Sequence, residues 1–127
     1  MKRVIGLGGI FFKAKDPKAL YEWYRKHLGV ESNPGAGASW RDADHPEIPG
    51  CNVFAIFPAG TNYFAASQSS FMINFRVENV DELLKALREE GVEVDPKVER
   101  YDYGNFGWIM DPEGNRVELW EPPKNHS

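Results

Sequence analysis

Two stretches of the chain carry apolar side chains at the spacing of an amphipathic helix. The first predicts a helix over about 16–28, with Asp16 as its N-cap and Gly29 just past its end. The second predicts a helix over about 80–90, with Asn79 as its N-cap. The apolar positions are Leu20, Trp23, Tyr24 and Leu28 in the first stretch and Val80, Leu83, Leu84 and Leu87 in the second.

The other apolar segments are short and bounded by turn residues, which predicts strands. One strand precedes each helix, over 4–14 and over 71–78. The segment 111–115, Asp-Pro-Glu-Gly-Asn, predicts a tight turn, since proline fixes φ and glycine allows positive φ. Further strands are expected over 37–43, 52–57, 92–94, 103–110 and 116–120. Each half of the chain is therefore expected to form a strand, a helix and then two or three strands.

A repeat in the sequence accompanies this order of elements. Residues 12–16 match residues 75–79 at a spacing of 63 (75 minus 12). Residues 56–60 match residues 110–114 at a spacing of 54 (110 minus 56). A repeat of this length indicates two similar units that bury a core together.

We predict an α+β fold in which two tandem βαβββ modules form one curved, mainly antiparallel sheet. Module one covers about 4–66 and module two about 70–122, within a single domain over 1–127 that ends in a frayed tail at 123–127. Each helix is expected to cover one face of the sheet. The other face is then free to form a cup.

Two segments of the chain resemble the vicinal oxygen chelate superfamily, which includes glyoxalase I, extradiol dioxygenases, fosfomycin-resistance enzymes and bleomycin-binding proteins. They are F-K-A-K-D-P-x-A-L-x-x-W-Y-x-x-x-L-G over 12–29 and W-I-M-D-P-E-G-N-R-V-E-L-W-E-P over 108–122. The resemblance implies paired βαβββ modules and a homodimer. It also implies a small-molecule site in the cup, so the expected partners are a second copy of the chain and a small ligand.

The resemblance also implies metal ligands at four equivalent strand positions. These positions correspond to Gly9, Met72 and Glu118, and to Phe64 by the spacing of 54. A divalent metal needs about three or four nitrogen, oxygen or sulfur donors, and only Glu118 supplies a strong one. We therefore predict no metal and no other cofactor at this place, with a divalent metal held by unexpected residues as the alternative.

Strand alternation predicts which other side chains share the cup with Gly9, Met72 and Glu118. Glu118 is the candidate catalytic residue, because a carboxylate in an apolar strand is costly to bury and its pKa is then raised. The alternative is a structural ion pair or hydrogen bond with Arg76, Arg116 or Asn74. Phe54 and Trp108 are left open, since their register is not fixed by the pattern. The predicted ligand-binding residues are Phe11, Lys13, Phe64, Met72, Asn74, Arg76, Arg116 and Trp120.

The three histidines give weaker signals. His27 is expected at the exposed end of the first helix, and His126 lies in the tail. His45 lies in the acidic segment 42–47, Asp-Ala-Asp-His-Pro-Glu, which is interpreted as a solvated loop or as a lid over the cup. The role of this loop stays open.

Composition narrows the class of protein further. The net charge of −4 argues against nucleic-acid binding, which depends on basic contacts to phosphates. The single cysteine, Cys51, excludes an internal disulfide and fits a reducing, cytoplasmic location. No apolar run approaches the roughly 20 residues that a membrane-spanning helix needs, so no membrane association is expected.

Three functional hypotheses follow. The first is a protein that binds an aromatic or otherwise apolar small molecule in a metal-free cup. The second is a lyase, isomerase or dioxygenase that uses Glu118 as an acid or base, or that holds a metal with unexpected residues. The third is a non-catalytic structural dimer whose cup holds no ligand.

Overall fold

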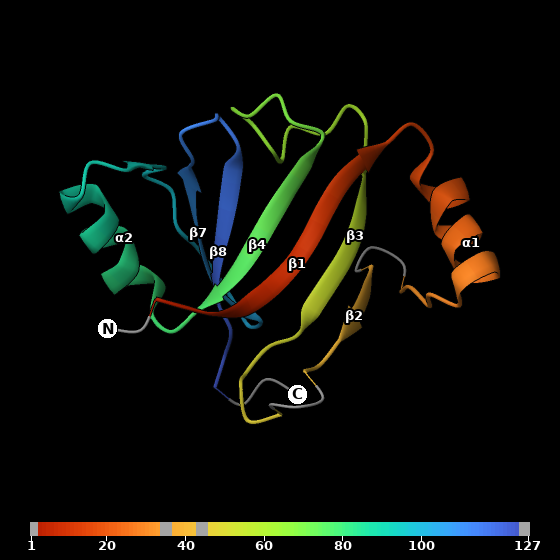
Figure 1. Ribbon diagram of the computed structural model, residues 1–127, viewed down its shortest axis with the longest axis horizontal. Helices are drawn as coiled ribbons and strands as arrows, with labels where there is room; N and C mark the ends of the chain where they lie inside the picture. Colours follow the sequence, from red (N-terminus) through yellow and green to blue (C-terminus); the bar gives the residue numbers. More distant parts are fainter. Residues whose placement is uncertain (1–2, 34–36, 43–45, 125–127) are drawn as a thin grey trace.

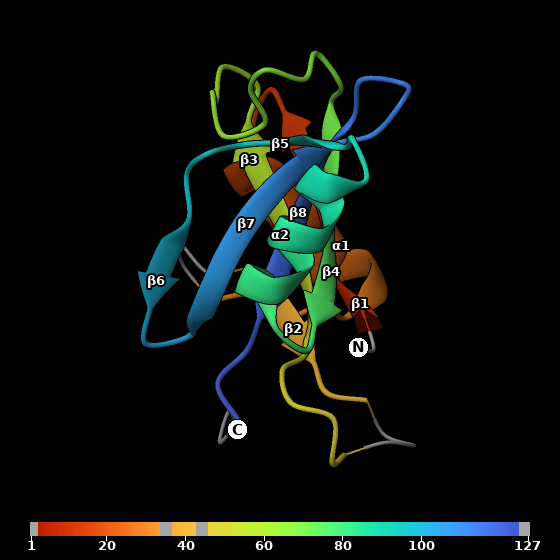
Figure 2. The ribbon, with the colours of Figure 1, turned by 90° about the vertical axis from the view of Figure 1, so that its left-hand side faces the viewer.

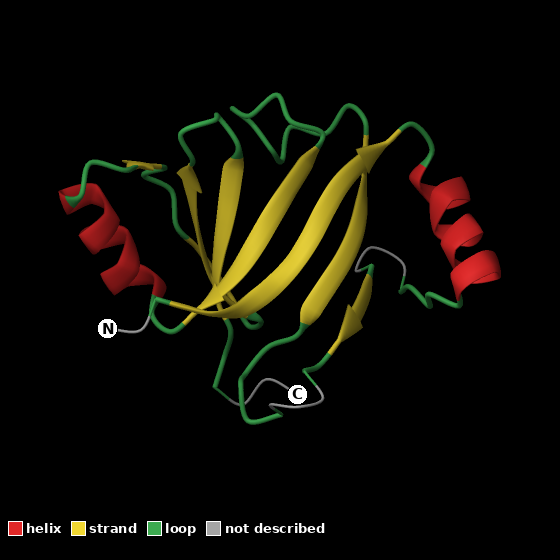
Figure 3. Ribbon diagram, viewed as in Figure 1, coloured by secondary structure: helices red, strands yellow, loops and turns green. Residues whose placement is uncertain are grey.

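The computed structural model describes residues 3–33, 37–42 and 46–124. A single curved sheet runs through it, with one helix at each end (Figures 1 and 3). The first half contains β1 (Val4–Ala14), α1 (Pro17–Leu28), β2 (Ala38–Trp40) and β3 (Asn52–Pro58). The second half contains β4 (Phe71–Val77), α2 (Val80–Glu89), β5 (Glu93–Val94), β6 (Glu99–Tyr101), β7 (Gly104–Met110) and β8 (Arg116–Glu121).

The sheet is mixed and has the order β2-β3-β1-β4-β8-β7-β5, with β6 paired to β7. The first strand of each half pairs in parallel with the last, β1 with β3 and β4 with β8. The two halves join where β1 and β4 pair antiparallel. The predicted α+β fold of two tandem modules is confirmed. In the described residues the first half has two strands after its helix, whereas the second half has four (Figure 2).

Both helices begin where their capping residues predict. The Asp16 carboxylate accepts a hydrogen bond from the Ala19 N–H at 3.0 Å, and the Asn79 side chain accepts one from the Glu82 N–H at 3.0 Å. Gly29 ends α1 in the left-handed region at φ 68°, which a glycine adopts without strain. None of the helices in the described residues is long and apolar enough to cross a membrane.

The apolar core falls into two clusters on opposite faces of the sheet. One packs under α2 and contains Val77, Val80, Leu83, Leu84 and Leu119. The other fills the concave face and contains Phe11, Cys51, Phe64, Met72, Phe106, Trp108 and Trp120. The predicted alternation of β4, of β8 and of Phe11 in β1 is therefore correct. The predicted position of Gly9 in the cup is wrong, because the pairing of β1 with β4 shifts between Leu7 and Gly9, and Gly8 faces the Asn74 side chain instead.

The pairing registers correct one equivalence between the halves. Phe11 pairs with Ala55, and Asn74 pairs with Glu118, so positions 63 residues apart (118 minus 55) are equivalent. The counterpart of Glu118 is thus Ala55, and its assignment to Phe64 was wrong. Phe64 lies in the loop after β3. The spacing of 54 misled because it matches the turn at the end of β3 with the turn at the end of β7, whereas Glu118 lies in β8.

Candidate functional site

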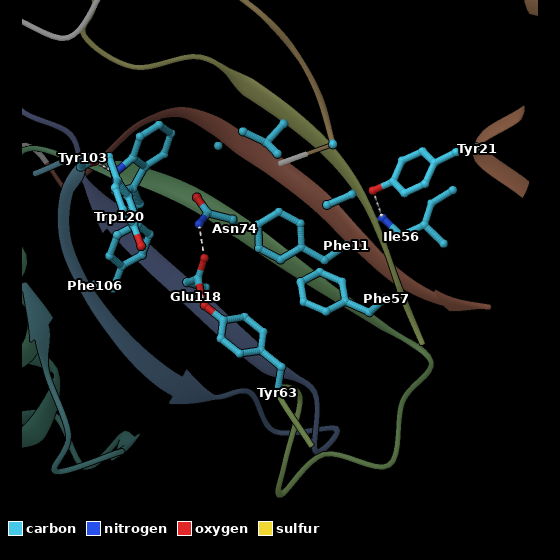
Figure 4. A pocket seen from close by; sticks show the side chains of 14 residues that line it. Phe11, Tyr21, Ile56, Phe57, Tyr63, Asn74, Tyr103, Phe106, Glu118 and Trp120 are labelled. Carbon is cyan, nitrogen blue, oxygen red and sulfur yellow. Dashed lines mark hydrogen bonds between the residues drawn. The ribbon is translucent and has the colours of Figure 1, made fainter. Parts of the chain in front are cut away.

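A cavity of about 690 Å³ lies on the concave face of the sheet. Its lining comes from both halves of the chain: from α1, from strands and the residues next to them, and from the loop after β3 (Figure 4). The first half and this loop contribute Gly8, Phe11, Tyr21, Gly37, Val53, Ala55, Ile56, Phe57 and Tyr63. The second half contributes Asn74, Tyr103, Phe106, Glu118 and Trp120.

Glu118 accepts three hydrogen bonds beside this cavity. Its Oε1 accepts from the Asn74 amide Nδ2 at 2.5 Å. Its Oε2 accepts from the Tyr63 hydroxyl at 2.5 Å and from the Trp108 indole Nε1 at 2.9 Å. Glu118 is only 1% exposed, so these three neutral donors replace the water that a carboxylate would otherwise bind.

Burial has the largest effect on the pKa of the Glu118 carboxyl. Desolvation raises the pKa of Glu118 above its ordinary value, although its hydrogen bonds and the charge of Arg116 act in the opposite direction. Burial and the neighbouring Glu118 also raise the pKa of the Tyr63 hydroxyl. Tyr63 therefore stays protonated and donates to the carboxylate.

The other end of the Asn74 amide lacks a partner. Its Oδ1 is buried and accepts no hydrogen bond from the described residues. This oxygen occupies the space beside Gly8, where a Cβ would lie 1.8 Å from it. Glycine at position 8 is what allows Asn74 to turn its Nδ2 towards Glu118.

Aromatic rings form walls on two sides of these polar groups (Figure 4). On one side Phe57 stacks on Tyr63 with ring centres 5.4 Å apart, and Phe11 lies 5.7 Å from Phe57. On the other side Phe106 and Trp120 are parallel at 6.1 Å. The cavity is therefore suited to a flat apolar molecule that meets a few polar atoms.

The predicted site residues divide into three groups. Phe11, Asn74, Trp120 and the candidate catalytic residue Glu118 line the cavity. Phe64 and Met72 are fully buried in the apolar cluster of the same face. Lys13, Arg76 and Arg116 lie outside the lining. The Lys13 Nζ lies over the Phe64 ring, 5.4 Å from its centre.

The two arginines are engaged elsewhere. Arg76 is buried, and its guanidinium binds Asp42 at 2.6 Å together with the carbonyl oxygens of Leu7 and Pro49. Arg116 donates to Asp95 at 3.1 Å and borders a second cavity of about 260 Å³. Both arginines fix protein segments, and their roles as ligand clamps are not supported by these contacts.

Several lining residues were missed from the sequence. Tyr63 and the other rings from Tyr21, Phe57, Tyr103 and Phe106 were not predicted. Of the two residues left open, Trp108 joins the concave cluster, while Phe54 lies on the other face against Tyr24, with ring centres 5.0 Å apart. Tyr63 lies in a loop, where no periodicity indicates the direction of a side chain.

The residues at the site do not fit a divalent metal. The four equivalent positions carry Gly9, Ala55, Met72 and Glu118, and the only strong donor group already holds three hydrogen bonds. Residues 3–33, 37–42 and 46–124 contain no cluster of three or more His, Cys, Asp or Glu side chains. His45 and His126 lie outside these residues.

Comparison with known proteins gives a family and a set of structural neighbours. The model of the Glyoxalase/Bleomycin resistance protein/Dioxygenase superfamily matches residues 6–119. No curated protein sequence matches the chain significantly.

The structural neighbours include two methylmalonyl-CoA epimerases and a glyoxalase. An epimerase in complex with methylmalonyl-CoA and NH4+ is 19% identical, with a TM-score of 0.73 and coverage of 98% of this chain and 99% of that one. The epimerase from Mycobacterium tuberculosis is 20% identical (TM-score 0.63; coverage 94% and 89%). The Mn(II)-bound glyoxalase from Novosphingobium aromaticivorans is 17% identical (TM-score 0.61; coverage 95% and 40%). At these identities the likeness concerns the fold.

Proposed function

Because the chain belongs to the Glyoxalase/Bleomycin resistance protein/Dioxygenase superfamily, we propose that it binds a small aromatic or apolar molecule in the cup without a metal. The observation that carries this proposal is the cavity of about 690 Å³, whose walls are aromatic rings around Glu118 and Asn74. A site of this size and makeup is typical of small-molecule pockets.

The ligands named for the structural neighbours suit this cavity poorly. A manganese ion needs donors that Gly9, Ala55 and Met72 do not have. Methylmalonyl-CoA carries a carboxylate, and within the part of the chain that the structure describes no lysine, arginine or histidine lines the cavity. A different, metal-free ligand therefore agrees better with the side chains present.

A second candidate is an enzyme in which Glu118 acts as an acid or base. It is favoured by the burial that raises the pKa of this group at the edge of the cavity. The three hydrogen bonds to Glu118 argue against it, because they stabilise the carboxylate form and lower the pKa that burial raises. Glu118→Gln distinguishes the two: turnover of any substrate found would be lost if Glu118 transfers a proton, and kept if it only binds.

A homodimer is part of the proposal. The α1 helix has no buried residue, and Trp23 and Leu28 are 50% and 64% exposed. In β1, Leu7 and Ile10 are also exposed. Exposed large apolar side chains favour burial against a second copy. Dimerisation without any ligand is the third hypothesis. A cytoplasmic location is proposed for the ligand-binding protein and for the structural dimer alike.

Binding is tested by tryptophan fluorescence and by thermal shift against a panel of aromatic compounds. A compound that binds the folded state raises the melting temperature by mass action. Phe11 and Phe12 form a matched pair, because Phe11 lines the cavity and Phe12 packs against Phe54 on the other face. Phe11→Leu is expected to weaken binding about tenfold and Phe12→Leu to leave it unchanged. A panel without any binder would favour the structural dimer.

Metal titration tests the other part of the proposal. Ni²⁺, Zn²⁺, Fe²⁺ and Mn²⁺ added to the purified protein are expected to bind weakly and without fixed stoichiometry, since one carboxylate is too few ligands. One tightly bound ion per chain that is lost in Glu118→Gln would contradict the metal-free cup.

A further inference from the structure

We propose that the molecule bound in this cavity is an organic cation: a protonated amine or amidine attached to an aromatic body. The inference rests on the proposed binding function and names the chemical class of its ligand. It follows from the charge, the hydrogen-bonding capacity and the ring faces of the lining.

The described part of the lining has one acidic group and no basic one. Of the fourteen lining residues among 3–33, 37–42 and 46–124, only Glu118 is an Asp, Glu, Lys, Arg or His. Its three partners, Tyr63, Asn74 and Trp108, are neutral donors. The guanidinium of Arg116 is bound to Asp95 and borders the second cavity. The carboxylate is therefore solvated by hydrogen bonds but not neutralised by a cation in contact with it.

Such a carboxylate is unfavourable in an apolar site. Burial of an ion without a counter-ion is costly, and hydrogen bonds recover only a part of the lost hydration. A cationic ligand supplies the missing charge, and an anionic ligand adds to the cost. The site thus favours cations over neutral molecules of the same shape, and neutral molecules over anions.

Asn74 provides a second, independent observation. Its side chain is 2% exposed, and its Oδ1 accepts no hydrogen bond from the described residues. An unpartnered acceptor in a buried position lowers stability until a donor reaches it. Ammonium and amidinium groups carry several N–H donors and no acceptor, so they suit an acceptor whose residue lines the cavity next to Gly8 and donates its other end to the carboxylate.

The ring faces complete the argument. Figure 4 shows Asn74 and Glu118 between Phe106 and Trp120 on one side and Phe11 and Phe57 on the other. Aromatic faces attract cations and stack on flat apolar groups. An aromatic body between these walls brings a charged substituent to the polar atoms at the centre.

Three isosteric naphthalenes test the charge preference on the unmodified protein. 2-Naphthamidine is cationic, 2-naphthamide neutral and 2-naphthoate anionic at neutral pH, and all three have the same flat body. Titrations followed by tryptophan fluorescence and calorimetry are expected to show the amidine binding at least about tenfold more tightly than the amide, because a hydrogen bond to a charged group is worth more than a neutral one. The naphthoate is expected to bind most weakly.

Two variants test whether the Glu118 charge causes the preference for the amidine over the amide. Glu118→Gln is expected to reduce the preference for the amidine over the amide to about twofold or less. Glu113→Gln removes the same charge from the exposed turn between β7 and β8, and it is expected to leave the preference unchanged. Circular dichroism checks that both variants are folded.

The outcomes separate the two proposals. If the amide or the naphthoate binds as tightly as the amidine, or if Glu113→Gln removes the preference as completely as Glu118→Gln, the cationic ligand is wrong while binding in the cup stands. If none of the three binds at about 1 mM and the wider aromatic panel also fails, the binding function falls and the inference falls with it.

Discussion

The two halves of the sheet present equivalent positions to the cup but fill them with different chemistry. In the first half Phe11 faces Ala55, and both are apolar. In the second half, 63 residues later (74 minus 11), Asn74 faces Glu118, and both are polar. The repeated backbone therefore supplies a symmetric hollow, and the side chains at these paired positions make it asymmetric, apolar in the first half and hydrogen-bonding in the second.

The helices differ between the halves in the same way. The α2 helix buries Val80, Leu83 and Leu84 against the sheet. The α1 helix begins with an equally good cap but buries no residue completely. The two helices thus have similar capping residues but different amounts of buried surface. Because most helical stability in proteins comes from packing, α2 depends more on its contacts with the sheet than α1 does.

The largest expected effect separates the two helices. Leu83 and Leu20 occupy equivalent positions, 63 residues apart (83 minus 20), but Leu83 is 3% exposed and Leu20 only half-buried. We expect Leu83→Ala to lower the free energy of unfolding by about 3–4 kcal/mol, and Leu20→Ala by about 1 kcal/mol, because a buried leucine leaves a cavity. Urea unfolding at low protein concentration measures both.

An equal loss for both variants would break the comparison. It would mean that α1 is buried as deeply as α2, and a second copy of the chain is the available partner. The loss for Leu20→Ala would then depend on protein concentration, because dissociation contributes to unfolding.

A second prediction concerns the polar half of the cup. Glu118→Leu leaves the Tyr63 hydroxyl, the Asn74 amide and the Trp108 indole without their acceptor. We expect a loss of about 2–3 kcal/mol in the free energy of unfolding, because buried donors are costly to leave unpaired. Glu118→Gln keeps an acceptor oxygen and should lose less. A Glu118→Leu variant as stable as the unmodified protein would show that the carboxylate is present for function rather than stability.

A third prediction tests how the first half supports the second. A methyl group at Gly8 would lie 1.8 Å from the Asn74 Oδ1 and displace the amide that binds Glu118. Gly8→Ala is therefore expected to cost about 1–2 kcal/mol and to weaken ligand binding. Gly60→Ala is the matched control, since no atom lies within 4 Å of the Cβ it would add. If both substitutions are equally mild, Asn74 does not depend on the space beside Gly8.

Much of this architecture follows from local rules. The spacing of 63 residues between 12–16 and 75–79 predicts the tandem modules, and strand alternation places Phe11, Asn74 and Glu118 on one face. These inferences succeed because backbone periodicity is a property of the strand itself.

The rest of the site depends on longer-range contacts. Tyr63 reaches Glu118 from a loop 55 residues earlier in the chain, and a loop has no period from which to predict a direction. The sequence did not identify Ala55 as the counterpart of Glu118. The turn residues at 58–60 resemble those at 112–114, but they follow β3 and β7, whereas the strand equivalent to β3 is β8. The direction of Tyr63 and the register of Ala55 are therefore set by contacts between segments that are distant in the sequence.

The smallest expected effect is a pH dependence that again distinguishes the two halves, since among the described residues the buried acid, Glu118, lies in the second half. Burial raises the pKa of Glu118 above its ordinary value of 4.5, so between that pH and the raised value the folded protein holds a proton that the unfolded chain has released. The free energy of unfolding of the unmodified protein, minus that of Glu118→Gln, should therefore fall as the pH rises from 4.5, by at most about 1.4 kcal/mol per pH unit.

Asp95 provides a control of opposite sign. The Lys97 backbone N–H and the Arg116 side chain lower the pKa of Asp95 below its ordinary value of 3.8. The stability that this carboxylate contributes is therefore present above pH 3.8 and is lost as the pH falls through its lowered pKa, which makes the difference from Asp95→Asn shrink on acidification. Denaturant unfolding between pH 3 and pH 8 measures both differences. If the Glu118 difference also shrinks on acidification, its three donors outweigh its burial, and the cavity holds a stabilised anion rather than a strained one.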